Sequence, residues 1–315
     1  MEIMKLKPAF KDYIWGGNKL KNEFDFNSDL EKIAEAWMLS CHKDGENIIL
    51  NGEFKNEKLS TVINNHKEFL GSNCKNYHDF PILIKFIDAK NDLSIQVHPD
   101  NEYALKNEHE YGKTECWYIL DCEENSEIVY GFNKNISKEE FKNGILNNSF
   151  LKNVNKVKSK KGDMFFIEAG TLHAICKGNF LIEIQQNSNT TYRVYDYDRI
   201  GNDGKKRELH IEKALDVTKC EKPKYNITPM GKIENYKDYS KQLITSCNLF
   251  KVNKVNVKSN YIDTANDKSF VSVIITNGKG KINNLDIKKG DSMFIPANYG
   301  KYIISGDIEA IITTV

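Results

Sequence analysis

The segment Gly162-Asp-Met-Phe-Phe-Ile-Glu-Ala-Gly-Thr-Leu-His173 has the pattern of a strand, a turn and the beginning of a second strand. Its four apolar residues, at positions 164–167, predict a short buried strand. Gly170 predicts a tight turn after that strand, so His173 begins the returning strand. The segment therefore predicts a strand–turn–strand unit.

Short strands recur along the chain, separated by Gly, Asn and Asp. They are rich in Ile, Val, Phe and Tyr, and several alternate in polarity, which is typical of β-strands. Helical patterns are fewer, at residues 59–70, 137–145 (after a capping box that begins at Ser137) and 211–217. Many short strands joined by turns indicate a sandwich or a barrel. The predicted strands are 82–87, 93–97, 116–120, 163–167, 180–185, 191–195 and 250–257.

A second copy of the opening segment lies 128 residues further along the chain. Residues 160–170 have the sequence KKGDMFFIEAG, and residues 288–298 have the sequence KKGDSMFIPAN. Upstream, residues 115–120 have a looser counterpart at 269–274. Such a repeat, with the same order of strand and turn, indicates two copies of one β-rich module. A connecting stretch at 218–240, with two prolines and weak periodicity, separates them, and we predict domains at 1–235 and 236–315.

The first copy also matches a known motif. Residues 162–173 fit the second cupin motif, G-x5-P-x-G-x2-H, except that Glu168 occupies the proline position; the second copy carries Pro296 there. This resemblance implies the double-stranded β-helix, or jelly-roll, of the cupins. We therefore predict a mainly β protein of two cupin-like barrels with a few helices.

The amino-acid composition of this chain argues against two classes of partner, nucleic acids and membrane surfaces. Its 315 residues include 45 Lys and Arg against 44 Asp and Glu, a formal net charge of +1. Nucleic acids and membrane surfaces require a basic excess, so we predict neither as a partner. The sequence shows no apolar stretch long enough to span a bilayer and no secretory signal. Seven cysteines without a CxxC pair are typical of reduced thiols and predict a cytoplasmic protein.

Residue types that bind metals occur in three of these segments. Strand alternation places Ser94, Gln96 and His98 on one face of the 93–97 strand. Glu115 leads into the 116–120 strand, and His173 follows the glycine turn. Two imidazoles, a carboxylate and an amide oxygen suit a zinc-like divalent ion, although a 2-His-1-carboxylate set also suits Fe(II). Taken alone, the Gln-x-His pattern is better explained as a solvent-facing polar edge.

The stretch from 181 to 199 is polar at unusual positions for two strands. Glu183 and Gln185 alternate with isoleucines, and Arg193 lies between Tyr192 and Val194. If the apolar set packs outward between layers, the polar set lines a barrel interior. The reverse orientation, with the polar set in solvent, fits the alternation equally well.

Several ordered motifs together resemble the type I mannose-6-phosphate isomerases, in their compact bacterial form. The motifs are QVHPD, GKTECWYI, GTLHAI, LHIEKAL and the run from Glu183 to Arg193, and the resemblance covers essentially the whole chain. It implies one zinc ion per chain, bound by Gln96, His98, Glu115 and His173. It also implies a catalytic role for Arg193 and Glu183, and matches Lys85 and Lys113 to lysines of the family.

The resemblance implies the reversible conversion of mannose 6-phosphate into fructose 6-phosphate. The zinc-assisted reaction moves a proton from C2 to C1 through an enediol(ate), and we predict Glu183 as the base. Zinc and Arg193 are expected to stabilise the developing negative charge, and the alternative role for Arg193 is to bind the phosphate. The predicted contacts to this small sugar phosphate are Lys85, Lys113, Ser94 and Arg199. The alternatives are another metal-dependent cupin, such as an Fe(II) oxygenase or a different phosphosugar isomerase, and a non-catalytic sugar-binding cupin.

The second module is expected to be free of metal. Aligning Gly162 with Gly290 places Lys301 opposite His173, and Ser269 lies about where Glu115 would be. The sequence from 241 to 315 contains no histidine, and a protonated lysine cannot coordinate zinc. We predict that this module covers apolar surface of the first or shapes its mouth.

Overall fold

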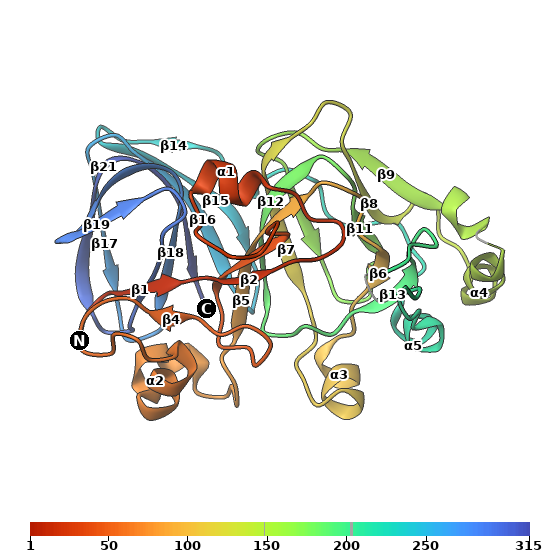
Figure 1. Ribbon diagram of the computed structural model, residues 1–315, viewed down its shortest axis with the longest axis horizontal. Coiled ribbons are helices and arrows are strands. Elements are labelled where there is room, and N and C mark those ends of the chain that lie inside the picture. The colour runs from red at the N-terminus through yellow and green to blue at the C-terminus, as the bar shows by residue number, and fades with distance from the viewer. Residues whose placement is uncertain (148, 202–203) are drawn as a thin grey trace.

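The computed structural model describes residues 1–147, 149–201 and 204–315 (Figure 1). Two β-domains lie side by side: strands from the middle of the chain, coloured yellow to green, form one, and the blue C-terminal strands form the other. The N-terminal segment, in red, runs across both domains. The mainly β fold of two cupin-like barrels with a few helices is confirmed.

The first barrel consists of two antiparallel sheets. One has the strand order β10-β7-β12-β5-β3-β2, and the other has the order β13-β6-β11-β8-β9. Each strand predicted between residues 82 and 195 overlaps a strand of these sheets. The bounds of the observed strands are β2 Ala9–Lys11, β3 Glu35–Leu39, β5 Ile82–Ala89, β6 Ile95–Val97, β7 Glu115–Cys122, β8 Glu127–Phe132, β9 Val154–Lys158, β10 Met164–Ile167, β11 His173–Ile175, β12 Asn179–Gln186 and β13 Tyr192–Tyr195.

The central strand β12 shows how the polar interior arises. Its side chains alternate between the two faces of the sheet. Ile182 and Ile184 point outward into an apolar core that also contains Phe270 of the second barrel. Glu183 and Gln185 therefore face inward and are buried there. Of the two orientations that the alternation allowed, the structure has the one with the polar set inside.

The second barrel is built on one large sheet with the order β14-β15-β16-β21-β18-β20-β1-β4, in which β17 also pairs with β21 and β19 with β18. Strand β1 comes from the N-terminus and pairs with β20, so residues 4–7 extend the C-terminal sheet. Apolar side chains fill the interior, among them Val273, Met293 and Tyr302. The bounds are β1 Met4–Lys7, β4 Ile48–Ile49, β14 Glu234–Asn235, β15 Tyr239–Ser246, β16 Lys251–Val257, β17 Asn260–Ala265, β18 Val271–Ile282, β19 Leu285–Lys288, β20 Ser292–Ile295 and β21 Gly300–Thr314.

The two copies of the sequence repeat form equivalent turns. Gly162 and Gly290 both have a left-handed backbone, with φ of 93° and 89°. The amide of Gly162 donates to the carbonyl of Ile119 at 2.9 Å, and that of Gly290 donates to the carbonyl of Ile275 at 2.8 Å. The repeat in sequence is therefore also a repeat in backbone hydrogen bonding.

These hydrogen bonds correct one detail of the sequence alignment. Glu115 pairs with Ile167 in the first barrel, and Val271 pairs with Ile295 at the equivalent place in the second. Val271, and not Ser269, is therefore the counterpart of Glu115. The two-residue error arose because similarity between short apolar strands is weak, whereas the hydrogen-bonded register is specific. A valine supplies no ligand atom, so the correction leaves the second barrel without a carboxylate at this position.

Short helices cover the barrels from outside. Helices α4 and α5 pack Phe141, Ile145 and Leu215 against the outer face of the five-stranded sheet. The Ser137 hydroxyl accepts a hydrogen bond from the amide of Glu140, which confirms the predicted cap. No helix in the described parts of the chain is long and apolar enough to cross a membrane. The bounds are α1 Lys19–Phe24, α2 Leu59–Asn65, α3 Asn101–Asn107, α4 Lys138–Leu146 and α5 Ile211–Val217, with 3-10 turns at Lys67–Leu70, Ser72–Cys74 and Ser149–Lys152.

The helix predicted at 59–70 is shorter than expected. It ends at Asn65, and residues 67–70 form a separate 3-10 turn. His66 between them has φ of −131°, outside the helical region. Two asparagines and a histidine in succession have weak helix propensity, so the helix is not sustained through them.

Candidate active site

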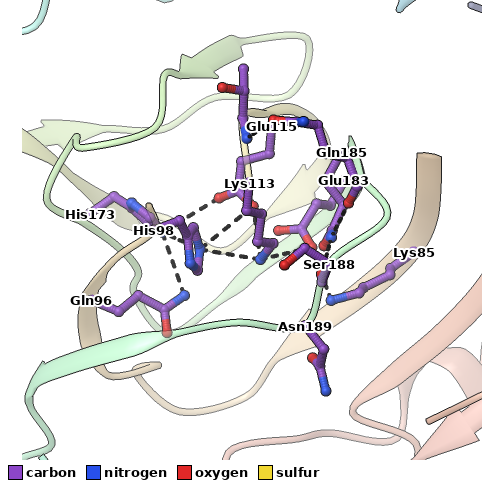
Figure 2. A network of polar contacts seen from close by, with 12 residues as sticks. Lys85, Gln96, His98, Lys113, Glu115, His173, Glu183, Gln185, Ser188 and Asn189 are labelled. Atoms are coloured by element: carbon purple, nitrogen blue, oxygen red, sulfur yellow. Dashed lines mark hydrogen bonds and ion pairs between the residues drawn. The ribbon is translucent and has the colours of Figure 1, made fainter. Parts of the chain in front are cut away.

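Three strands of the first barrel bring four predicted ligands together (Figure 2). Gln96 lies in β6, Glu115 begins β7 and His173 begins β11, while His98 directly follows β6. The Nε2 atoms of the two histidines lie 3.2 Å apart. Glu115 Oε1 lies 3.4 Å from His173 Nε2, and its Oε2 lies 3.8 Å from His98 Nε2. His98, Glu115 and His173 are almost completely buried, so these atoms meet inside the barrel.

Backbone carbonyls fix the orientation of both imidazole rings. Nδ1 of His98 lies 2.9 Å from the carbonyl oxygen of Thr190, and Nδ1 of His173 lies 2.8 Å from that of Thr171. A carbonyl only accepts hydrogen bonds, so each Nδ1 carries the proton and each Nε2 presents a lone pair to the cluster. Burial lowers the pKa of His173 to about 4 and that of His98 well below its usual value. Both rings are therefore neutral near pH 7, as metal binding requires.

Glu115 supplies a carboxylate with unmet bonding capacity. Its side chain is fully buried, and no described residue forms a hydrogen bond with its Oε1. Burial, with the negative charge of Glu183 in addition, raises the pKa of Glu115 to about 8. A buried carboxylate that keeps one oxygen available beside two imidazole lone pairs forms a site that a cation stabilises. Within the described ranges, His98, Glu115 and His173 form the one cluster of this kind, and they fit a divalent ion such as zinc.

Gln96 lies beside this cluster. Its Nε2 is 3.5 Å from His173 Nε2, and Ser94 donates its hydroxyl hydrogen to Oε1 at 3.3 Å. A half-turn of the amide exchanges its oxygen and nitrogen, which would direct the oxygen at the cluster. The position therefore suits a fourth ligand, and Ser94 adjoins the same site.

A cavity of about 250 Å³ opens beside the cluster. Of the residues predicted for substrate binding or catalysis, Lys85, Ser94, Lys113, Glu183 and Arg193 line it, as does Gln96. Arg199 does not. The remaining lining residues, which sequence reasoning missed, are Tyr13, Trp15, Glu35, Ile87, Leu93, Ile175, Asn189, Thr191 and Arg207.

Buried lysines and carboxylates alternate along one wall of the cavity. Lys85 Nζ lies 3.3 Å from Glu183 Oε1 and 3.6 Å from Glu35 Oε2. Lys113 Nζ lies 2.9 Å from Glu115 Oε2 and 3.9 Å from Glu183 Oε1. Lys113 joins Lys85, Glu35 and Glu183 to the cluster of predicted ligands, because its Nζ also lies 3.2 Å from His98 Nε2.

Glu183 is held in its ionised form. Burial alone would raise the pKa of this carboxyl, but Lys113 and Lys85 outweigh burial and lower the pKa to about 2. The indole N–H of Trp117 also donates to Glu183 Oε2 at 2.8 Å. A fixed, ionised carboxylate therefore faces the cavity near the metal cluster.

The three arginines of the chain differ in their surroundings. Arg193 Nη1 donates to the carbonyl of Glu208 at 2.7 Å, while its buried Nε has no hydrogen-bond partner in residues 1–147, 149–201 and 204–315. Arg199 donates to the carboxylate of Asp196 and to the carbonyl of Asp92, away from the cavity. Arg207 lines the cavity instead. The structure thus brings Arg193, but not Arg199, together with the other predicted residues.

Glu35 and Arg207 are two of the missed residues, and only Glu35 could have been noticed in the sequence. Glu35 begins the strand Glu-Ala-Trp-Met-Leu, and a carboxylate in an otherwise apolar, fully buried strand is unusual enough to be noticed. Arg207 belongs to a polar loop with no periodicity. Only the folding of that loop onto the barrel brings it to the cavity, and no local pattern could have indicated this.

The fold and the site define a class of protein: the two-barrel cupins with a buried cluster of two histidines and one carboxylate near a polar cavity. Comparison with known proteins identifies the family. Residues 3–143 match the catalytic domain of type I phosphomannose isomerase, and residues 240–315 match the cupin domain of mannose-6-phosphate isomerase.

Relatives that match along the whole chain agree with this. Mannose-6-phosphate isomerase ManA of Bacillus subtilis is 37% identical over 99% of this chain and 98% of its own length. The mannose-6-phosphate isomerase of Streptococcus mutans is 37% identical over 98% and 97%. The chain belongs to the type I mannose-6-phosphate isomerase family, whose members are aldose–ketose isomerases.

Solved structures show the same architecture. The crystal structure of mannose 6-phosphate isomerase from Bacillus subtilis superposes with a TM-score of 0.92 at 36% identity and covers 100% of both chains. Variants of phosphomannose isomerase from Salmonella typhimurium superpose with a TM-score of 0.78 at 17% identity, covering 99% of both chains. At that identity the likeness concerns the fold alone.

Proposed function

We propose that this enzyme interconverts mannose 6-phosphate and fructose 6-phosphate, using one zinc ion held by Gln96, His98, Glu115 and His173. The observation that carries the proposal is a polar cavity lined by Gln96 and Lys113, the two residues that contact the imidazoles and the buried carboxylate. The cavity contains fixed cationic and anionic groups, which a phosphorylated sugar requires. Full-length relatives that carry the name of this activity support the same substrate.

Aldose–ketose isomerisation moves a proton from C2 to C1 of the open-chain sugar through an enediol(ate). Glu183 is the proposed base because it is an ionised carboxylate that lines the cavity. Lys85 and Lys113 lie within 3.9 Å of its Oε1, and their positive charges keep the carboxylate ionised and therefore able to accept the proton from C2. The Trp117 hydrogen bond keeps the carboxylate in one orientation throughout.

Negative charge develops on the substrate oxygens in the enediol(ate). Bound zinc would supply Lewis-acid stabilisation of that charge. Arg193 would supply hydrogen-bond donors, since its side chain lines the cavity and its buried Nε has no partner among the residues that the structure describes. Lys85, Lys113 and Ser94 remain the proposed contacts to substrate because they line the cavity as well. Arg199 can act only indirectly, through the Asp196 carboxylate that it contacts.

The second barrel has no catalytic part in this proposal. Its counterpart of Glu115 is Val271, and apolar side chains fill its interior. Ile182 and Ile184 of the catalytic barrel pack on the same core as its Phe270 and Phe294. The proposed role of this metal-free domain, residues 236–315, is to cover the outer face of the catalytic sheet.

An isomerase assay tests the proposal. Zinc-loaded protein is given mannose 6-phosphate, and fructose 6-phosphate formation is followed with a coupled enzyme. The Glu183→Gln variant, purified in the same way, is the control for a contaminating isomerase. Failure of fully zinc-loaded wild-type protein to form fructose 6-phosphate contradicts the proposal. Iron in the purified protein together with substrate-dependent O2 consumption would instead support an oxygenase.

A further inference from the structure

The phosphate group of a sugar phosphate needs a cationic partner, and the two cavity lysines are already neutralised. Lys85 lies between Glu35 and Glu183, and Lys113 lies between Glu115 and Glu183. Both lysines are 4% exposed, so these pairs are shielded from water. A phosphate dianion placed here would have to compete with three buried carboxylates for two ammonium groups. The lysine wall is therefore a poor site for the phosphate.

Arg193 and Arg207 form another part of the cavity lining, the arginine wall, and its charge balance is the opposite one. The carboxylates that line the cavity, Glu35 and Glu183, both pair with Lys85. Arg193 and Arg207 line the cavity too, and burial followed by the charge of Arg207 lowers the pKa of Arg193. Two guanidinium groups close enough to disfavour one another form a site that an anion stabilises.

The hydrogen bonds of Arg207 leave one of its nitrogens available. Nε donates to Asp196 Oδ2 at 2.8 Å, and Nη2 donates to Asp196 Oδ1 at 2.5 Å. This two-point contact with a carboxylate that is 5% exposed fixes the plane of the guanidinium group. Within the described parts of the chain Nη1 has no hydrogen-bond partner. Arg207 is thus held rigidly in the cavity wall with donors to spare.

Arg199 is bonded to the same carboxylate but lacks this capacity. Its Nε donates to the carbonyl of Asp196 at 3.2 Å, its Nη1 to the carbonyl of Asp92 and its Nη2 to the Asp196 carboxylate. All three nitrogens are engaged, and the residue does not line the cavity. Arg199 therefore holds Asp196 in place and Asp196 in turn positions Arg207.

We propose that Arg207, positioned by Asp196, binds the phosphate group of the substrate, which leaves Arg193 free to act at the reacting oxygens. The identity of the sugar phosphate rests on the proposed function. The placement of the phosphate rests on the two walls of the cavity, which differ in charge balance.

Steady-state kinetics of Arg207→Gln test this assignment. Loss of a charged hydrogen-bonding partner should raise KM for mannose 6-phosphate by about 10- to 100-fold, with kcat changed by less than about threefold. Inhibition by inorganic phosphate should weaken by a similar factor. The matched control is Lys281→Gln, which removes one positive charge from an exposed residue of the second barrel and should leave both quantities unchanged. Arg199→Gln should raise KM less than Arg207→Gln.

Asp196→Asn tests the positioning role separately. It keeps both arginines and should raise KM, again with little change in kcat, because Arg207 loses its fixed orientation. If Arg207→Gln does not fold, Arg207→Lys, which keeps the charge without the two-point contact, should show the KM effect of Asp196→Asn. An unchanged KM in a folded Arg207 variant, or a larger KM effect in Arg199→Gln, overturns the assignment.

A binding measurement separates this inference from the proposed function. Inorganic phosphate should raise the melting temperature of the zinc-loaded wild-type protein and of Lys281→Gln, but not that of Arg207→Gln. If the wild type forms no fructose 6-phosphate but shows this pattern, the proposed function fails and the anion site stands. If all three proteins respond equally to phosphate, the anion site fails whatever the enzyme turns over.

Discussion

Replacing Glu115 with Gln should stabilise the metal-free protein and abolish its response to zinc. Glu115 lies fully buried between His98 and His173, with an oxygen that has no hydrogen-bond partner. In the metal-free protein this carboxyl is a cost to folding, whereas zinc binding turns its charge into a ligand. The amide of Gln has nearly the same shape but carries no charge. The substitution should therefore remove both the destabilisation of the metal-free protein and the stabilisation by zinc.

The magnitude follows from the pKa of Glu115. Burial raises that pKa from an ordinary 4.5 to about 8, so at pH 7 the folded protein takes up a proton that the unfolded chain does not. The difference of 2.5 pH units between 4.5 and pH 7 corresponds to about 3 kcal/mol of lost stability. This is an upper limit for Glu115→Gln, because Lys113 loses a partner at 2.9 Å in the same substitution. At about 2 °C per kcal/mol for a chain of this size, the metal-free variant should melt several degrees higher.

The sign of the pH dependence is fixed by the same linkage. A carboxyl whose folded pKa is raised contributes stability below its unfolded pKa, and that contribution is lost as the pH rises through the folded pKa. The difference in stability between metal-free Glu115→Gln and the metal-free wild type should therefore be small near pH 5 and increase toward pH 8. Melting curves of chelator-treated proteins at several pH values, with and without added zinc, measure both effects.

Two outcomes would refute this reasoning. One is a metal-free variant that melts below the wild type at pH 7.5, since that would show that the Glu115 carboxylate already stabilises the fold through Lys113. The other is a variant whose melting temperature still rises with zinc as much as that of the wild type. The second result would remove Glu115 from the ligand set.

Other predictions concern the ligands and the base. His98→Ala and His173→Ala should each lower zinc content and activity together. The loss should exceed about 10- to 100-fold, which is typical of a residue that only supports a ligand. Normal zinc occupancy in both variants would contradict the proposed site. Glu183→Gln should lower kcat by about 10²- to 10⁴-fold while zinc content is retained, and near-normal turnover would assign the base to another group. Elemental analysis should find one zinc per chain, and a second tightly bound ion within residues 241–315 would contradict the metal-free assignment of the second barrel.

Strand positions and ligand types were determined by local sequence. The apolar run at 164–167 and the glycine turn after it gave a strand that the structure contains, because alternation and turn chemistry act over a few residues. His98, Glu115 and His173 are recognisable as candidate ligands for the same reason: each lies at the beginning or end of a short, well-marked strand. The repeat was visible too, although its register was not, and the counterpart of Glu115 was misplaced by two residues.

Only the tertiary structure decided how the polar residues are used. The alternation in β12 is compatible with either face being buried. In the structure Ile182 and Ile184 belong to the apolar core that the first barrel shares with Phe270 of the second, so Glu183 faces inward. Arg207 lines the cavity and is held there by Asp196, a contact that no spacing in the sequence specifies. Strand periodicity is a property of neighbours along the chain, whereas the charge balance of a cavity wall depends on residues that meet only after the barrel has closed.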